Sequence, residues 1–260
     1  MVQDMELLQI IAENTEAKDS FYIIATAKGK STVTQSFSPP LIFRQRSNGT
    51  TNYEMALVGL NTYYSFPNID ETNNTVTMFK KVGKEWQELN TVVLGTGCYE
   101  VEAIDKEIKR QMGWGKDAPV KFAPNNSTLN CVMNVKKDYK VNFAVENSLA
   151  SVLGFSQKEY YEGRWESDEI VNILKVNSIL VYCDIISGSR VDGLEKPIIF
   201  HFSPNVAPGI KIVIEPQQPI YLPITVDTIS QMTIWLTDQE GRPIDLRGEN
   251  IVFNFHVRAR

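Results

Sequence analysis

Two histidines and three cysteines are the side chains of this 260-residue chain best suited to act as a general base, a nucleophile or a metal ligand. His201 and His256 each lie in a segment that alternates with apolar residues, "FHF" and "FHV", and they could share one face of a sheet. A zinc site needs three or four ligands at defined spacing. Cys98, Cys131 and Cys183 are widely separated, and the chain has no CxxC or HxxxH pair. The sequence therefore predicts no metal site.

The other motifs of catalysis and cofactor binding are incomplete. Cys98 in "GTGCYE" has no histidine fixed beside it, and there is no GxSxG elbow for a serine nucleophile. The "GKS" of residues 29–31 ends like a phosphate-binding loop, but Ile24 stands where that loop needs glycine and no helix follows. A solvated hairpin turn is the better interpretation of this segment. We therefore expect no cofactor.

Carboxylate pairs are present, but their setting favours structure over catalysis. Asp238 with Glu240, and Asp227 with Asp245, stand in turn-forming segments, where aspartate commonly caps the backbone. A glycosidase pair stays open at this point, because its two carboxylates come from distant strands. We predict no catalytic residues and a protein that is not an enzyme.

The framework that would position these side chains is mainly β. From residue 21 onward, segments rich in β-branched and aromatic residues are separated by Gly, Pro and Asn at the spacing of a sandwich or barrel. Long crossing segments between the first and last strands favour jelly-roll wiring. We expect an antiparallel jelly-roll β-sandwich over residues 21–95 and 166–260, with a small α+β insertion over residues 96–165.

The insertion is indicated by the clearest helical spacing in the chain. Ile104, Ile108 and Met112 recur at four-residue intervals, and Gly113 follows them as a stop signal. A shorter helical segment is expected to end at Gly154. Short strand patterns lie between the two, so the segment predicts a mixed α+β unit.

Two features near the surface could contact partners. Residues 1–20 predict an arm or short helix, with Leu7, Leu8, Ile10 and Ile11 on or near one stripe, and both a frayed terminus and a partner-binding arm are open.

Adjacent tyrosines form the second feature. Tyr160 and Tyr161, like Tyr63 and Tyr64, could form a flat surface platform for a glycan. The favoured interpretation is that one tyrosine of each pair points inward and the other lies at a subunit contact.

The composition argues against several classes of partner. The chain has 26 basic and 31 acidic side chains and a net charge of -5, so a nucleic-acid-binding face is not expected. No apolar run reaches the ~20 residues of a membrane span. The odd number of scattered cysteines predicts reduced thiols, and the N-terminus does not resemble a signal peptide. We expect synthesis and folding in the interior of a cell.

Several phrases occur together in an order typical of one family. They are "YEMALVGLNTYYSFPNIDETNNTV", "GTGCYEVEAIDKEIKRQM", "SLASVLGF", "ILVYCDIISGSRVDG", "QPIYLPI" and "IWLTDQEGRPIDLRGENIVFNFHV". From Tyr53 to the C-terminus, the chain resembles the minor capsid, or penton, proteins of Polinton/Maverick elements, adintoviruses and related virophage-like viruses.

The resemblance implies a single jelly roll that assembles as a homopentamer at the five-fold vertices of an icosahedral capsid, beside a double jelly-roll major capsid protein. It also implies a virion location, an insertion domain whose counterpart would be residues 96–165, and no catalytic residues. The matching positions read as turns, a helix stop and strand ends, namely Pro67, Asn68, Gly154, Phe155, Asp184, Gly188, Pro223, Asp238 and Gly241. A glycan- or receptor-binding β-sandwich is the alternative function.

Overall fold

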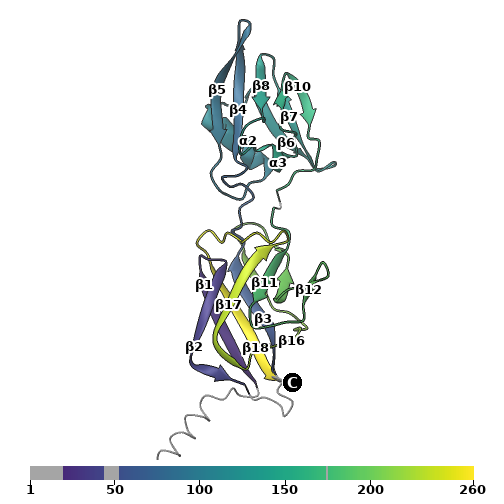
Figure 1. Ribbon diagram of the computed structural model, residues 1–260. Coiled ribbons are helices and arrows are strands. Elements are labelled where there is room, and N and C mark those ends of the chain that lie inside the picture. The colour runs from purple at the N-terminus through teal and green to yellow at the C-terminus, as the bar shows by residue number, and fades with distance from the viewer. Residues whose placement is uncertain (1–19, 44–52, 174) are drawn as a thin grey trace, which may run out of the picture. The chain divides into compact units, whose positions relative to one another are not determined.

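The chain folds into two compact units, each described here by itself (Figure 1). The sandwich unit comprises the described residues up to Ser65 and those from Val176 onward, and the inserted unit runs from Phe66 to Lys175. The computed structural model describes residues 20–43, 53–173 and 175–260.

Eight main strands and three short ones build the sandwich unit. The main strands are β1 (Ser20–Lys28), β2 (Thr32–Ile42), β3 (Tyr53–Tyr63), β11 (Ile179–Cys183), β14 (Ile198–Phe202), β15 (Lys211–Ile214), β17 (Thr228–Asp238) and β18 (Asn250–Ala259). The short ones are β12 (Arg190–Val191), β13 (Leu194–Glu195) and β16 (Leu222–Pro223).

The wiring of the eight main strands is that of a jelly roll. One sheet has the order β1-β18-β3-β15, and the other has the order β14-β11-β17-β2, with antiparallel pairing throughout. Numbered along the chain, these orders are 1-8-3-6 and 5-4-7-2. Two four-stranded sheets related in this way form the double Greek key of a jelly roll. The predicted fold class is therefore confirmed.

Strict alternation of side chains explains the core of the sandwich unit. In β18, Ile251, Phe253, Phe255 and Val257 point inward and are at most 1% exposed, while the residues between them face outward. Because successive side chains of a strand point to opposite faces, one apolar face of each sheet is buried. The two prolines of β2 lie in an edge strand, as a missing backbone donor requires.

Seven strands and two helices build the inserted unit. The strands are β4 (Thr75–Val82), β5 (Glu85–Val93), β6 (Val120–Asn125), β7 (Asn130–Val135), β8 (Tyr139–Asn142), β9 (Glu159–Tyr160) and β10 (Gly163–Glu166). They form two antiparallel sheets with the orders β5-β4-β8-β9 and β10-β7-β6. The helices are α2 (Val101–Met112) and α3 (Ala150–Leu153).

Both predicted helices end where the sequence places a glycine. In α2, Ile104 and Ile108 are buried, and Gly113 follows in the left-handed conformation with a φ of 66°. Gly154 ends α3 with a φ of 77°. Glycine adopts this conformation without the penalty of a Cβ, which is why it stops helices.

The boundaries of the insertion differ from the predicted 96–165. The β4–β5 hairpin belongs to the inserted unit, because β4 pairs with β8 on its other side. The hairpin has the alternation of any antiparallel strand pair, and alternation does not reveal which sheet a hairpin joins. Residues 66–95 and 166–175 therefore belong to the inserted unit, and the predicted boundaries are too narrow.

The turn after β1 also differs from its interpretation as a hairpin. Gly29 turns the chain with a φ of 64°, as expected. However, β1 pairs with β18 and β2 pairs with β17, so the turn connects two different sheets. Such crossing connections are what distinguish a jelly roll from a simple meander.

Candidate functional site

The outward face of the sheet β1-β18-β3-β15, which we call the outer face, presents large apolar side chains. Tyr22 is 69% exposed and Ile24 is 66% exposed, and both project from β1. Val213 of β15 is half exposed at the other end of the same sheet. Exposed apolar groups that gather on one rigid face are typical of contact surfaces.

His256 occupies the centre of a hydrogen-bonded cluster on this face. Its Nε2 lies 2.7 Å from the Ser20 hydroxyl, and its Nδ1 lies 2.8 Å from the Tyr221 hydroxyl. The ring of Tyr22 lies 4.8 Å away, centroid to centroid. A hydrolase triad instead has a carboxylate that orients the imidazole. Here hydroxyl groups bracket both ring nitrogens, so the arrangement fixes the ring in the surface without activating the serine.

An ion pair continues the cluster along the face. Arg258 Nη2 lies 2.7 Å from Glu54 Oε1, and the Arg258 guanidinium stacks 3.5 Å from the centroid of the Tyr221 ring. Only 7% of Glu54 is exposed. The pair therefore anchors its residues in the sheet and leaves little of its charge for a ligand.

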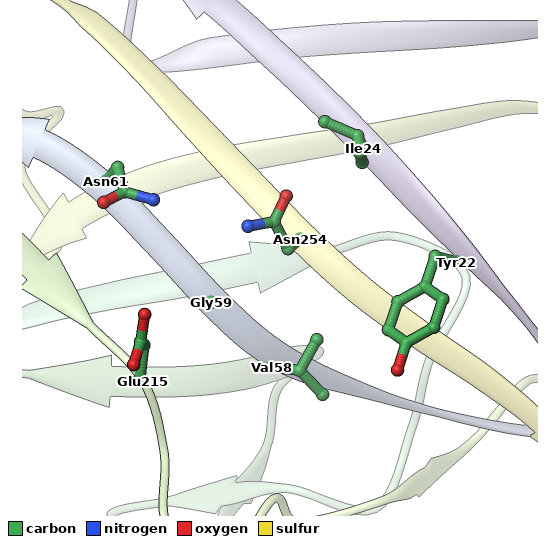
Figure 2. Close-up of a pocket in the computed structure, with 7 residues that line it drawn as sticks. All are labelled: Tyr22, Ile24, Val58, Gly59, Asn61, Glu215 and Asn254. Atoms are coloured by element: carbon green, nitrogen blue, oxygen red, sulfur yellow. The ribbon is translucent and has the colours of Figure 1, made fainter.

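A groove of about 440 Å³ lies beside this cluster on the outer face (Figure 2). Its lining residues come from three neighbouring strands, β1, β18 and β3, and from the residue that follows β15. They are Tyr22, Ile24, Val58, Gly59, Asn61, Glu215 and Asn254. Figure 2 shows Asn61, Asn254 and Glu215 as the polar groups, with Tyr22, Ile24 and Val58 as the apolar ones.

A β-bulge in β3 makes the room for this groove. Asn254 pairs with Gly59 and Phe255 pairs with Leu57, so Val58 is an extra residue in β3. The bulge lets Leu57 and Leu60 both point inward, where each is at most 1% exposed. Gly59 then forms a floor without a side chain, and a Cβ there would lie 2.9 Å from Asn254 Nδ2. Bulges of this kind commonly redirect side chains at functional sites.

The residues that the sequence offered for chemistry are not brought together. His201 lies in β14 and His256 in β18, which belong to different sheets, so the expectation that they could share a face is wrong. Burial raises the pKa of Cys131 and of Cys183 to about 12, which makes these thiols poor nucleophiles. The Cys98 thiol donates to the carbonyl of Phe66 at 3.1 Å. Among the described residues, no group of three or more His, Cys, Asp or Glu could hold a metal ion.

Asp238 is a turn residue, as its sequence setting indicated. It is buried at the end of β17, and its Oδ1 accepts the backbone N–H groups of Glu240 and Arg242 at 2.9 Å. Its other oxygen accepts from Arg242 Nε at 2.6 Å. This carboxylate is therefore fully occupied in holding the β-turn.

The tyrosine pairs follow the favoured interpretation in their burial. Tyr160 is 2% exposed, so its assignment as a surface aromatic is wrong, whereas Tyr161 is 46% exposed. The β9 strand pairs Tyr160 with Val141 in the core, and alternation places the next residue outside. Tyr64 is buried and Tyr63 exposed in the same way.

Tyr161 belongs to an aromatic and charged patch on the inserted unit. The Lys140 ammonium lies 4.5 Å from the ring centroid of Phe79, 5.3 Å from that of Trp86 and 5.7 Å from that of Tyr161. It also donates to Glu159 Oε1 at 2.6 Å, and this bond lowers the pKa of Glu159. We call these five residues the Lys140 patch.

Sequence reasoning missed the groove. Its residues lie in the predicted strands, but their shared position depends on pairing between segments that are far apart in the chain. The run "ALVGL", which interrupts strict alternation in β3, is the local signal that could have predicted the bulge. The predicted arm residues Leu7, Leu8, Ile10 and Ile11 lie outside the residues that the structure describes. Within the described ranges, no helix is long and apolar enough to cross a membrane.

Comparison with solved structures finds similarity to a mavirus penton protein, at a TM-score of 0.49 and 9% sequence identity. The alignment covers 93% of this chain and 100% of that chain. No protein-family model matches the chain, and no curated protein matches it. A likeness of this degree does not assign a function, so the function is argued from the residues of this chain.

Proposed function

We propose that this protein is a non-catalytic viral structural protein, a penton subunit that forms a homopentamer at the five-fold vertices of an icosahedral capsid. Its further partner would be a double jelly-roll major capsid protein, and its location the virion. This proposal follows the family resemblance of the sequence phrases from Tyr53 onward.

The outer face is the observation that carries the proposal. A jelly roll is rigid, because its two sheets share one packed core about 10 Å thick. Tyr22 and Ile24 project from this rigid face with about two-thirds of their surface exposed. A rigid face with exposed apolar groups suits a head-to-tail contact, in which a fixed rotation between identical subunits closes a ring.

The chemistry of the described residues supports a structural role. The hydroxyl groups around His256, the buried thiols and the occupied Asp238 carboxylate each have a structural explanation. Function is nevertheless decided by sites and not by fold, so the contact surface itself must be tested.

Light scattering on purified protein, alone and with its major capsid protein, tests the assembly. We expect a mass near five times the 29.5 kDa of the chain, either alone or on addition of the partner. Ile24→Glu should abolish the assembly, because it buries a charge at the contact. The matched control is Leu194→Glu, since Leu194 is 67% exposed but lies in β13, outside the outer face. A strict monomer that never joins the major capsid protein would contradict the proposal.

The Lys140 patch supports a second candidate, a glycan- or receptor-binding function of the inserted unit. Tyr161 is half exposed, and its hydroxyl donates to Glu159 Oε2 at 2.6 Å. An aromatic ring beside fixed polar groups is a common arrangement for ligand contact. The alternative therefore centres on Tyr161, since Tyr160 is buried.

A glycan array tests this candidate. Tyr161→Ala should remove any specific signal, while Ile170→Ala, which truncates an exposed apolar side chain of the same unit outside the Lys140 patch, should leave it unchanged. An array without specific signals, or one on which the two variants behave alike, would eliminate this role for the patch.

A further inference from the structure

The groove on the outer face contains polar side chains that have no partner within the protein as far as the structure describes it. Asn61, Asn254 and Glu215 line the groove, and none of their side-chain oxygen or nitrogen atoms makes a hydrogen bond or ion pair with a described residue. The neighbouring Glu54, by contrast, is paired with Arg258. The groove therefore gathers amide and carboxylate groups that the described part of the protein does not itself use.

The register of the sheet aligns these groups in cross-strand rows. Ile24 pairs with Asn254, Asn254 pairs with Gly59, and Glu215 directly follows Ile214, which pairs with Leu60. Four neighbouring strands at about 4.8 Å spacing give a row about 14 Å long. That length matches about four residues of an extended peptide.

The charge of the groove selects a cation. Glu215 is the one charged residue among those that line it, and two side-chain amide oxygens add further acceptors. A carboxylate forms its strongest hydrogen bonds with guanidinium or ammonium groups. An anionic ligand would meet repulsion here, and a neutral ligand would leave the Glu215 charge without a counterpart.

The apolar wall fits the remainder of a basic side chain. Ile24 and Tyr22 line the groove on the side away from Glu215, and Val58 lies between Glu215 and Tyr22 (Figure 2). Lysine and arginine carry long apolar stems that pack on such surfaces while the charged end reaches a polar group. The absence of a side chain at Gly59 keeps the floor open between the two ends.

From these features we infer that the groove is a subsite for an arginine or lysine side chain of a partner polypeptide. The stem lies against Ile24 and Val58, and the cationic end pairs with Glu215 and the two amides. This inference rests on the proposed function, because a partner side chain can occupy the groove only if the outer face contacts another polypeptide.

Solution NMR with Nα-acetyl-arginine amide at low ionic strength tests the subsite in a monomeric sample. The probe should shift the side-chain amide signals of Asn61 and Asn254. Nα-acetyl-norleucine amide, which has an apolar side chain without the charge, should bind about twofold to fivefold more weakly. Methyl α-glucopyranoside is the neutral polar comparison. Equal shifts with arginine and norleucine amides, or shifts with the glucoside alone, would overturn the inference.

Three variants locate the effect. Glu215→Gln keeps the shape and removes the charge, and should weaken binding of the arginine probe about twofold to fivefold, as expected for an ion pair with an exposed carboxylate. Gly59→Ala should weaken it several-fold by filling the floor, and the atom it meets is the end of a flexible side chain. Glu249→Gln, which changes an exposed carboxylate of the same unit outside the groove, should bind like the wild type.

In an oligomeric sample, a neighbouring copy or partner already fills the groove. There Glu215→Gln should lower the association constant at least tenfold, measured by light scattering over a dilution series, and Glu249→Gln should not change it. Failure of the proposed function appears as a monomer that never joins a capsid. Failure of this inference appears as a Glu215→Gln protein that behaves like the wild type in whichever sample is obtained.

Discussion

The two units of the chain differ in how they use their polar side chains. In the inserted unit, two conspicuous polar groups are paired within the unit: Lys140 bonds Glu159, and the Asn68 amide donates to the carbonyls of Tyr99 and Ile173. On the outer face of the sandwich unit, Glu215 and its neighbouring amides have no such partner among the described residues. The Lys140 patch and Asn68 satisfy their polar groups internally, and the groove leaves its polar groups available.

The cores of the two units are also closed differently. The sandwich unit buries alternate residues of two facing sheets, so one face of each sheet necessarily remains outside. The core of the inserted unit also contains helix α2 and an aromatic cluster. In this cluster, the ring centroid of Phe143 lies 5.5 Å from that of Phe155 and 5.9 Å from that of Tyr160. A core between two sheets leaves a broad outward face on each sheet that is available for contacts. A core that is partly covered by a helix leaves less of such a face.

The largest expected effects come from truncating one buried ring in each core. Phe255→Ala should destabilise the sandwich unit, and Phe143→Ala the inserted unit, by about 3–5 kcal/mol each, because each leaves a large cavity. Each unit has one fully buried thiol as a reporter, Cys183 and Cys131 respectively. Labelling these thiols at increasing urea concentration in a Cys98→Ser background measures the opening of each unit.

The outcome decides whether the two units are energetically separate. We expect Phe143→Ala to accelerate the labelling of Cys131 and to leave that of Cys183 within about twofold, which corresponds to less than about 0.5 kcal/mol. If both thiols respond equally to either substitution, the chain unfolds as one cooperative body and the comparison fails.

The next effect concerns glycines that the two units use at turns. Gly154→Ala should cost about 3 kcal/mol, because its φ is +77° and the added Cβ would lie 2.2 Å from the Glu169 carbonyl oxygen. Gly29→Ala in the sandwich unit should cost about 1–2 kcal/mol, since its Cβ would meet Gly248 Cα at 3.0 Å.

Urea denaturation with the same thiol reporters measures both changes. Gly83→Ala is the control for conformation alone, because its φ is also positive and nothing lies within 4 Å of the added Cβ. It should cost about 1 kcal/mol. Equal costs for all three glycines would show that the close approach at Gly154 is unimportant.

These glycines also show what a single sequence can predict. Gly113 and Gly154 are predictable as helix stops, because each signal is local to a few residues. The jelly-roll class followed from many such local signals together. In contrast, the sheet to which the β4–β5 hairpin belongs depends on pairing with β8, about 60 residues later, which leaves no mark in either segment.

The groove could not be predicted from the sequence either, because it depends on pairing between distant segments and on the bulge in β3. The extra residue Val58 shifts the alternation of β3, so counting by twos assigns the residues beyond the bulge to the opposite face. The unpaired state of Glu215 is likewise a property of what lies next to it in space. Alternation in the sequence predicts which face of a strand each side chain occupies, but only as far as the first bulge.

A smaller effect is expected from replacing one carboxylate in each unit. Asp238→Asn should destabilise the sandwich unit by about 1–3 kcal/mol, because the buried carboxylate loses its charged bond to Arg242. Glu159→Gln should cost less than about 1 kcal/mol in the inserted unit, since its pair with Lys140 is partly exposed. Chemical denaturation of both variants measures the difference. A larger loss for Glu159→Gln would show that the Lys140 patch stabilises the inserted unit more than its exposure indicates.

The smallest predicted effect is a response of the inserted unit to acid. Bonds from Arg110 lower the pKa of Glu107 to about 2, and bonds from Ser156 and Lys140 lower those of Asp168 and Glu159. A carboxyl group whose pKa is lower in the folded state stabilises the fold above its unfolded pKa, and this contribution is lost as pH falls.

The inserted unit should therefore lose stability as pH falls from about 4.5 toward 2, with only a small contribution from the solvent-screened Glu107–Arg110 pair. Trp235→Phe removes the one tryptophan of the sandwich unit, so the remaining fluorescence reports the inserted unit. The urea midpoint of this variant should fall between pH 5 and pH 2.5, and Glu107→Gln should reduce the fall. Glu85→Gln, an exposed change in the same unit, should not reduce it. A midpoint that stays constant over this range would mean that the internal pairs contribute nothing to the inserted unit, and would remove the electrostatic half of the comparison.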